Sequence, residues 1–132
     1  MSFNFTRSAQ EQTSLSKLMI DREQMTTADV NGKTLTIVGF DLIPKKQNGE
    51  TVVDPETGEV DTYAVITFKE FPKSYYNCGM VFSGVCKSWR DAFAGDIDAA
   101  NTELVKQGGV KARFVPGKTK QGRDVTNVVI LG

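Results

Sequence analysis

Apolar and polar positions alternate along residues 33–43, which read KTLTIVGFDLI. Leu35 and Ile37 alternate with threonines, and after Gly39 the apolar positions continue in the opposite phase. This pattern predicts a strand. A phase change at a glycine is typical of a β-bulge or a sharp bend. A strand needs such a bend when it curls around a small barrel.

A second alternating segment covers residues 62–71, which read TYAVITFKEF. One face consists of Ala64, Ile66 and Phe68, and we expect it to face the core. The other face mixes an aromatic ring, a hydroxyl and a base, a combination suited to ligand contact: Tyr63, Val65, Thr67 and Lys69.

Shorter patterns predict the remaining elements. A glycine-led apolar run predicts a third, short strand over residues 79–82. Helical spacing and capping residues then predict two helices: residues 84–94 with Ser83 as N-cap, and residues 97–107 with Asp96 as N-cap. Two further strands, residues 110–115 and 124–131, flank a basic, glycine-containing hairpin loop.

The order of these elements favours one architecture. Three strands, a helical segment and two strands, with the first strand bent at a glycine, is the order of the five-stranded oligonucleotide-binding barrel, the OB-fold. We therefore expect a mainly β domain over residues 26–132, with the helical segment between strands three and four. Residues 1–25 are polar with scattered apolar positions, so we expect a flexible N-terminal arm. A weak helix is the alternative, because Leu15, Leu18 and Met19 have the spacing of a short amphipathic helix.

Charge is segregated along the chain although the formal net charge is zero, with 16 basic and 16 acidic residues. Residues 62–90 and 110–132 together carry nine bases and two acids, so the remaining residues are net negative by seven. The acids gather in a turn-rich excursion over residues 44–61. If the basic segments are adjacent in the fold, they form one positive surface.

The composition excludes several kinds of chemistry. The absence of histidine removes histidine-based triads, proton relays and metal sites. Cys78 and Cys86 lack the spacing of a zinc or redox motif, so we interpret them as small buried residues. The sequence has no P-loop and no calcium-loop pattern. We expect a protein that is not an enzyme and needs no cofactor or metal.

Several segments taken together resemble a known family. They are KTLTIVGFDLI, TYAVITF, the glycine-led segment before the helix, and GGVKARFVPGKTKQGRDVTNVVIL. Over residues 26–132 they resemble single-stranded-DNA-binding proteins of phages and bacterial mobile elements. The resemblance implies that a DNA strand crosses the face of strands two and three, between the one–two and four–five loops. Many such proteins end in an acidic tail that recruits partners, and we expect that mode of recruitment to be absent here or to lie elsewhere.

Single-stranded nucleic acid is held by aromatic stacking on bases and by basic side chains along the phosphates. The sequence offers both kinds of residue where the resemblance expects them. The candidate DNA-binding residues are Lys45, Lys46, Tyr63, Lys69, Phe71, Lys73, Tyr75, Tyr76, Lys111, Arg113, Lys118, Lys120 and Arg123. Since stacking accepts any base, we expect little sequence preference.

Each candidate has an ordinary structural alternative, such as cross-strand pairing for Tyr63 or burial for Tyr75 and Tyr76. Two other classes also stay open for the whole protein. One is a protein-interaction module, such as a replication accessory or phage inhibitor protein, that uses the acidic excursion. The other is a virion or tail component.

No signal peptide or membrane-length apolar run is visible, so we expect a cytoplasmic location in a bacterial host cell. The expected partners are single-stranded DNA and replication or recombination proteins. The oligomeric state stays open, and the N-terminal arm is a candidate for exchange between subunits.

Overall fold

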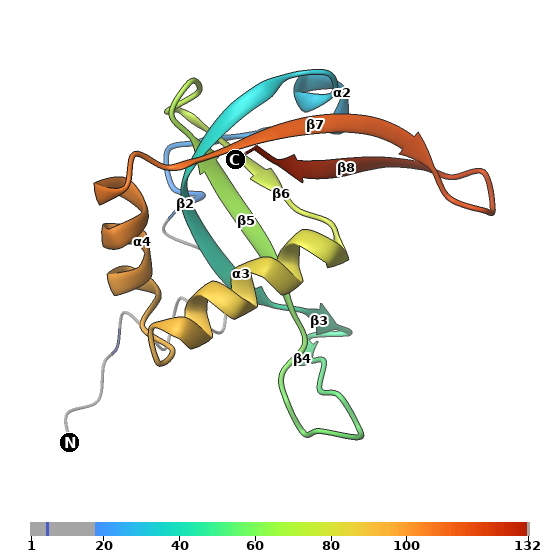
Figure 1. Cartoon of the computed structure of the whole chain (residues 1–132). Helices are drawn as coiled ribbons and strands as arrows, with labels where there is room; N and C mark the ends of the chain where they lie inside the picture. Colours follow the sequence, from blue (N-terminus) through green and yellow to red (C-terminus); the bar gives the residue numbers. More distant parts are fainter. Residues whose placement is uncertain (1–4, 6–17, 132) are drawn as a thin grey trace.

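The computed structural model describes Phe5 and residues 18–131, apart from the side chains of Lys46 and Met80. The chain forms a six-stranded, mixed and strongly curled open sheet, with two helices inserted between β6 and β7 (Figure 1). The elements are β1 (Glu23–Met25), α2 (Thr27–Val30), β2 (Thr34–Pro44), β3 (Lys46–Gln47), β4 (Glu50–Thr51), β5 (Thr62–Phe68), β6 (Ser74–Asn77), α3 (Met80–Ala92), α4 (Ile97–Lys106), β7 (Val110–Lys118) and β8 (Asp124–Ile130).

Strand β2 is the centre of the sheet because it pairs with two partners at different points along its length. Its first part, from Thr34 to Ile37, pairs antiparallel with β7, and the part from Ile37 to Pro44 pairs antiparallel with β5. The register shifts between Ile37 and Gly39. This shift confirms the bulge predicted from the phase change, and it lets the sheet turn between its two halves.

The strand order is β1-β6-β5-β2-β7-β8, so the sheet curls without closing among the described residues. A five-stranded OB-fold barrel was the prediction, and the observed sheet is an open half-barrel with a sixth strand. That strand, β1, pairs parallel with β6. It lies within the predicted N-terminal arm, of which residues 1–4 and 6–17 lie outside the described part of the chain.

The prediction of a third strand over residues 79–82 is wrong, because the third long-range pairing is made by β6 and residue 80 already begins α3. Phe82, Cys86 and Trp89 recur at helical spacing and pack into the core, whereas Val81 is 89% exposed. A four-residue apolar run does not separate a strand from the first turn of a buried helix, which explains the error.

One of the two predicted helix caps is confirmed and the other is wrong. Asp96 caps α4 by accepting from the backbone N–H of Ala99 at 3.0 Å, as predicted. Ser83 does not cap α3, whose N-cap is Gly79. Instead, the buried Ser83 hydroxyl accepts from the backbone N–H of Ala64 at 3.0 Å and ties α3 to strand β5.

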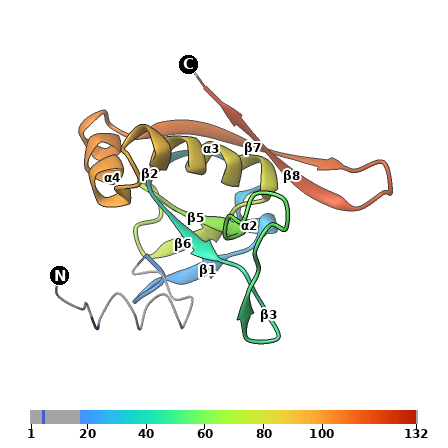
Figure 2. The ribbon, with the colours of Figure 1, turned by 90° about the horizontal axis from the view of Figure 1, so that it is seen from below.

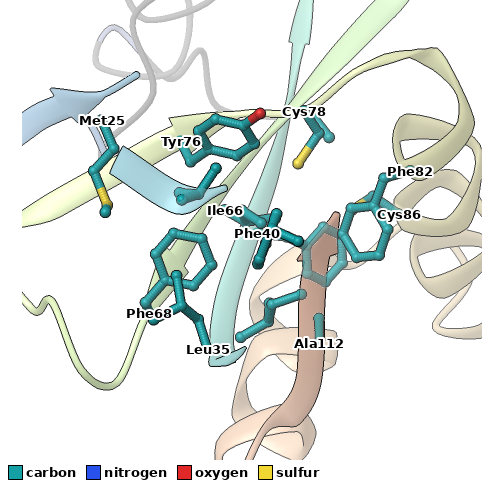
Figure 3. Close-up of a cluster of buried hydrophobic side chains, with 14 of the residues drawn as sticks. Met25, Leu35, Phe40, Ile66, Phe68, Tyr76, Cys78, Phe82, Cys86 and Ala112 are labelled. Carbon is teal, nitrogen blue, oxygen red and sulfur yellow. The ribbon is translucent and has the colours of Figure 1, made fainter. Parts of the chain in front are cut away.

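The main core lies between the concave side of the sheet and the two longer helices (Figure 3). Phe114 meets the rings of Phe68 and Tyr76 edge-on, with ring centroids 5.5 and 5.8 Å apart. Trp89 meets Phe40 edge-on at 5.4 Å, so the lone tryptophan packs against the main core as predicted, although it is only partly buried. Such aromatic pairs add stability beyond their buried area.

Helix α2 and the residues after it bridge the open side of the sheet. Val30 is fully buried, and the N–H of Gly32 donates to the carbonyl of Phe114 at 2.7 Å. The hydroxyl of Thr126 on β8 donates to the Asn31 side-chain oxygen at 2.6 Å. These contacts connect the two ends of the curled sheet in place of a further ladder.

The bend in β2 predicts that Gly39→Ala destabilises the protein. A Cβ at this position would lie 2.6 Å from the hydroxyl oxygen of buried Thr67, so the substitution should destabilise by about 1–3 kcal/mol through overpacking. The double variant G39A/T67A should recover part of this stability, because the next atom of Thr67 is 4.0 Å away.

Urea denaturation measures these changes, with Gly84→Ala as the control. Gly84 is exposed inside α3 and has open space around it, so its replacement should stabilise by about 0.5–1 kcal/mol. Equal destabilisation of G39A and G39A/T67A would contradict this account of the bend.

Candidate nucleic-acid interface

The outward face of β5 carries Tyr63, Val65 and Thr67, as the alternation predicts. The register places Tyr75 of β6 opposite Thr67, and Ile43 of β2 opposite Tyr63. This outward face is not open to solvent: Val65 is 0% and Tyr75 is 9% exposed. These two residues and Ile43 form a second apolar cluster, separate from the main core.

Leu18 and Met19 cover this second cluster, together with the half-buried ring of Tyr63. Burial, and secondarily the neighbouring Tyr75, raises the pKa of the Tyr63 phenol. The N-terminal residues that contact this face were not predicted to do so. A signal was present in the sequence, because Ala64–Phe68 is a nearly continuous apolar run, which is typical of a strand buried on both faces.

The two adjacent tyrosines of β6 point to opposite faces. Tyr75 belongs to the second cluster, and Tyr76, 6% exposed, lies in the main core against Phe114 and Phe68. Burial, the larger effect, raises the pKa of the Tyr76 phenol, which also hydrogen-bonds with the side chain of Thr126. Neither predicted stacking ring is exposed in this structure.

Phe71 is the predicted aromatic residue with the strongest basic surroundings. Its ring is half-buried at the edge of the main core, and the Lys33 ammonium lies 5.3 Å from the ring centroid. Lys69 and Lys73 flank it in sequence, and both side chains are exposed. Lys33 was not among the predicted site residues, since its contact with Phe71 depends on the pairing of distant segments.

Lys111 and Arg113 lie on the outward side of β7, and both are exposed. Their register partners on β2 are Thr36 and Thr34, so they stand beside the first half of the bent strand. The N–H of Lys69 donates to the carbonyl of Thr36 at 2.9 Å, which brings the end of β5 to the same place. The backbones of Lys69 and Lys111 therefore flank Thr36, just before the bend.

A carboxylate is held within this basic region by the backbone of β2. Glu70 accepts from the N–H of Thr36 at 2.7 Å and from its hydroxyl at 2.8 Å. Burial raises the pKa of the Glu70 carboxyl, but the hydrogen bonds from Thr36 outweigh it and leave that pKa below its ordinary value. The Glu70 carboxylate therefore has a structural role: it accepts the hydrogen bonds of Thr36 next to the bulge, where strand pairing is interrupted.

The hairpin of β7 and β8 projects from the rest of the molecule (Figure 1). Lys118, Lys120 and Arg123 are exposed along its tip, and β7 reaches Lys118, so the strand is longer than predicted. Thr119 shapes the turn through backbone and hydroxyl hydrogen bonds with Arg123. An ion pair at this tip joins the highly exposed Lys118 and Asp124 at 3.8 Å, and such exposed pairs contribute little to stability.

Lys45 and Lys46 lie elsewhere, at the base of the acidic excursion that contains β3 and β4. The Lys45 ammonium pairs with Asp61 at 3.3 Å, and the backbones of these two residues are also hydrogen-bonded. The excursion and the β7–β8 hairpin project in different directions (Figure 1). The structure therefore does not bring the bases of the one–two loop to those of the four–five loop.

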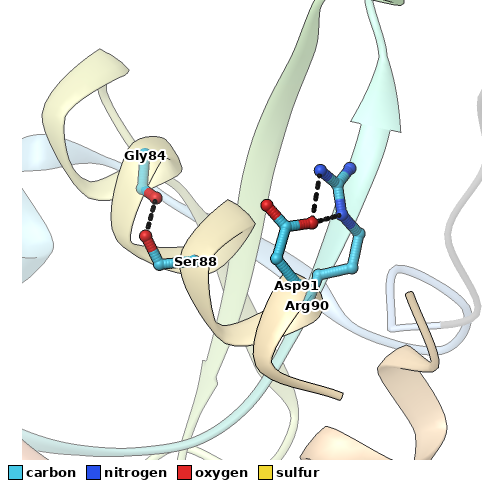
Figure 4. A network of polar contacts seen from close by, with 4 residues as sticks. All are labelled: Gly84, Ser88, Arg90 and Asp91. Atoms are coloured by element: carbon cyan, nitrogen blue, oxygen red, sulfur yellow. Dashed lines mark hydrogen bonds and ion pairs between the residues drawn. The ribbon is translucent and has the colours of Figure 1, made fainter. Parts of the chain in front are cut away.

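The bases of α3 also belong to a separate surface. Arg90 is paired with the adjacent Asp91 at 3.1 Å, and the Ser88 hydroxyl donates to the carbonyl of Gly84 one turn earlier (Figure 4). Lys87 is half-buried on the same helix. These contacts lie within α3 itself, so the bases of this helix are suitable for control variants.

Other kinds of site receive no support from the described residues. Within them, no group of three or more cysteine, aspartate or glutamate side chains is arranged to hold a metal ion. Burial raises the pKa of the Cys86 thiol to about 12, and that of Cys78 is also raised, so neither is an activated nucleophile. No helix in the described part of the chain is long and apolar enough to cross a membrane.

Comparisons of this chain with protein-family models, with curated proteins and with solved structures give no match.

The Glu70–Thr36 contact predicts a pH-dependent effect of Glu70→Gln. Because the folded-state pKa of Glu70 is depressed, its stabilisation is fully present above the ordinary value of 4.5 and declines as the pH falls through the lower folded value. E70Q should cost about 1 kcal/mol at pH 7. The difference from the unmodified chain should shrink at about pH 3.

Urea denaturation at the two pH values tests this expectation. Glu56→Gln, at an exposed turn of the acidic excursion, is the control and should have little effect at either pH. A cost of E70Q that stays constant between pH 7 and pH 3 would show that the charge of Glu70 is not what Thr36 recognises.

Proposed function

We propose that this protein binds single-stranded DNA without sequence preference and supports phage or mobile-element replication or recombination. The observation that carries the proposal is the set of exposed bases on the outward side of β7, on the β7–β8 hairpin and on the loop between β5 and β6. We call these bases the basic surface: Lys69, Lys73, Lys111, Arg113, Lys118, Lys120 and Arg123. The whole protein has zero net charge, so the positive charge of this surface is a local concentration.

The strand order supports an OB-type interpretation of the half-barrel. In this proposal β2, β5, β6, β7 and β8 correspond to the five barrel strands, with α3 and α4 as the insert between the third and fourth. The double pairing of the bent β2 with β5 and β7 agrees with this assignment. In OB-folds the strand two–three face and the four–five loop bind oligonucleotides, and the four–five loop corresponds to the basic hairpin here.

The burial of Tyr75 and Tyr76 changes the proposed mechanism from the one expected from sequence. Phosphate contacts by the exposed bases carry most of the affinity in this proposal. Phe71, between Lys69 and Lys73 and beside Lys33, is the aromatic ring best placed to stack on a base.

A second candidate function, protein interaction, is favoured by the acidic excursion. Val53 and Val60 form a bridge there and remain 48% and 45% exposed. The surrounding carboxylates are Glu50, Asp54, Glu56, Glu59 and Asp61. An apolar pair within an acidic projection suits a basic protein partner, such as a replication or recombination protein, and leaves the basic surface available to DNA.

Removing the hairpin bases should weaken DNA binding and reduce its dependence on salt. For single strands, each phosphate that a protein neutralises contributes about 0.7 to the slope of log affinity against log salt. The triple variant K118A/K120A/R123A should therefore reduce the slope by about 2 if each base neutralises one phosphate. Fluorescence anisotropy of a labelled oligo-dT, titrated at several salt concentrations, measures the slope.

The matched control is K87A/R90A/K106A, which removes three bases from α3 and α4 and should leave the slope unchanged. A duplex competitor should displace oligo-dT poorly. No binding of oligo-dT at low salt would reject the proposed function and favour protein interaction at the acidic excursion.

Phe71→Leu tests the stacking role separately from charge. Leucine preserves apolar packing against the core but cannot stack, so affinity for oligo-dT should fall by about 1–3 kcal/mol. The salt slope should stay the same, because every basic side chain is retained. Val85→Leu, at another half-buried position against the main core, is a packing control and should leave affinity unchanged. Unchanged affinity of F71L would remove this ring from the site.

A further inference from the structure

The outward face of β5 and β6 carries groups suited to nucleic-acid bases, but it is covered by the chain itself. Tyr63 and Tyr75 supply two rings there. Asn77, on the same face opposite Val65, has a buried amide oxygen without a hydrogen-bond partner among the described residues. A buried acceptor without a partner is costly, and a base N–H could satisfy it.

Among the described residues before β1, two make the covering contact. Leu18 and Met19 are half-buried over Ile43, Val65 and Tyr75. The following turn contains Asp21 at φ +59°, a conformation that is unfavourable for most residues other than glycine.

Arg22 and β1 hold this segment against the sheet. The Arg22 guanidinium donates to the carbonyl of Pro72 and to that of Leu18, each at 3.2 Å. The N–H of Glu23 donates to the carbonyl of Lys73 at 2.9 Å, where the three-residue β1 begins. β1 lies on the side of β5 and β6 away from α3 (Figure 2). The segment is thus anchored at its C-terminal end, beside the exposed Lys73.

We propose that residues 18–22 form a displaceable strap, and that single-stranded DNA and the strap compete for the outward face of β5 and β6. The inference rests on the proposed function and adds its regulation. With the strap docked, DNA contacts only the basic surface and the ring of Phe71. With the strap released, Tyr63 and Tyr75 become available to bases next to Lys73. The affinity observed for the intact chain is then reduced by the fraction of molecules with an open face.

The double variant L18S/M19S tests the competition, because it removes the apolar contacts of the strap and leaves the sheet unchanged. Affinity for oligo-dT should rise on the order of tenfold, as expected when an opening equilibrium no longer limits binding. Arg22→Ala should change affinity in the same direction but less. The control V81S/V105S replaces two exposed valines on the helices and should leave affinity unchanged. Circular dichroism verifies that each variant is folded.

Methionine oxidation gives a readout that does not depend on a variant. Saturating oligo-dT should accelerate peroxide oxidation of Met19 in the intact chain, while Met25, 7% exposed on β1, reacts slowly with and without DNA. Peptide mass spectrometry measures both rates.

The outcomes separate this proposal from the proposed function. If oligo-dT binds with the expected salt slope, but L18S/M19S binds no more tightly and Met19 oxidation is unchanged by DNA, the strap is rejected and DNA binding stands. If neither the intact chain nor L18S/M19S binds oligo-dT, both proposals are rejected.

Discussion

The architecture depends on the bend of β2 at Gly39. This one strand forms ladders with β7 before the bend and with β5 after it, so the two halves of the sheet are held at an angle by a single continuous backbone. The bend needs a residue without a side chain, because the hydroxyl of Thr67 occupies the space that a Cβ would take. Glu70 then satisfies the backbone N–H that the interrupted pairing leaves at Thr36. The bulge and the Glu70 carboxylate therefore stabilise the same bend.

Local periodicity was sufficient to predict the long elements. The alternation in β2 and β5, the capped helix α4 and the phase change at Gly39 each depend on neighbouring residues alone, and each is found in the structure. The start of α3 was wrongly predicted as a strand because its first turn is a short apolar run. The pairing of Tyr75 and Tyr76 with β5 and β1 could not be predicted locally, since register determines which ring faces which cluster.

In the candidate site, too, local features could be predicted from the sequence and long-range contacts could not. Exposure of the basic side chains of β7 and its hairpin follows from their outward positions on a strand and a turn, so the alternation along the chain indicated them well. The convergence of Lys33 with Phe71, and of Glu70 with Thr36, depends on contacts between segments more than 30 residues apart. The cover provided by Leu18 and Met19 comes from a mostly polar segment, whose helical spacing of Leu15, Leu18 and Met19 does not show which surface it contacts.

The separation of the two charged projections gives the molecule an uneven charge distribution, and hence an electric dipole, despite its zero net charge. The acidic excursion and the basic β7–β8 hairpin point in different directions (Figure 1). In the field of a polyanion such a dipole experiences a torque, which turns the basic end toward the polymer before contact. The benefit is limited to about one Debye length, roughly 8 Å at physiological ionic strength.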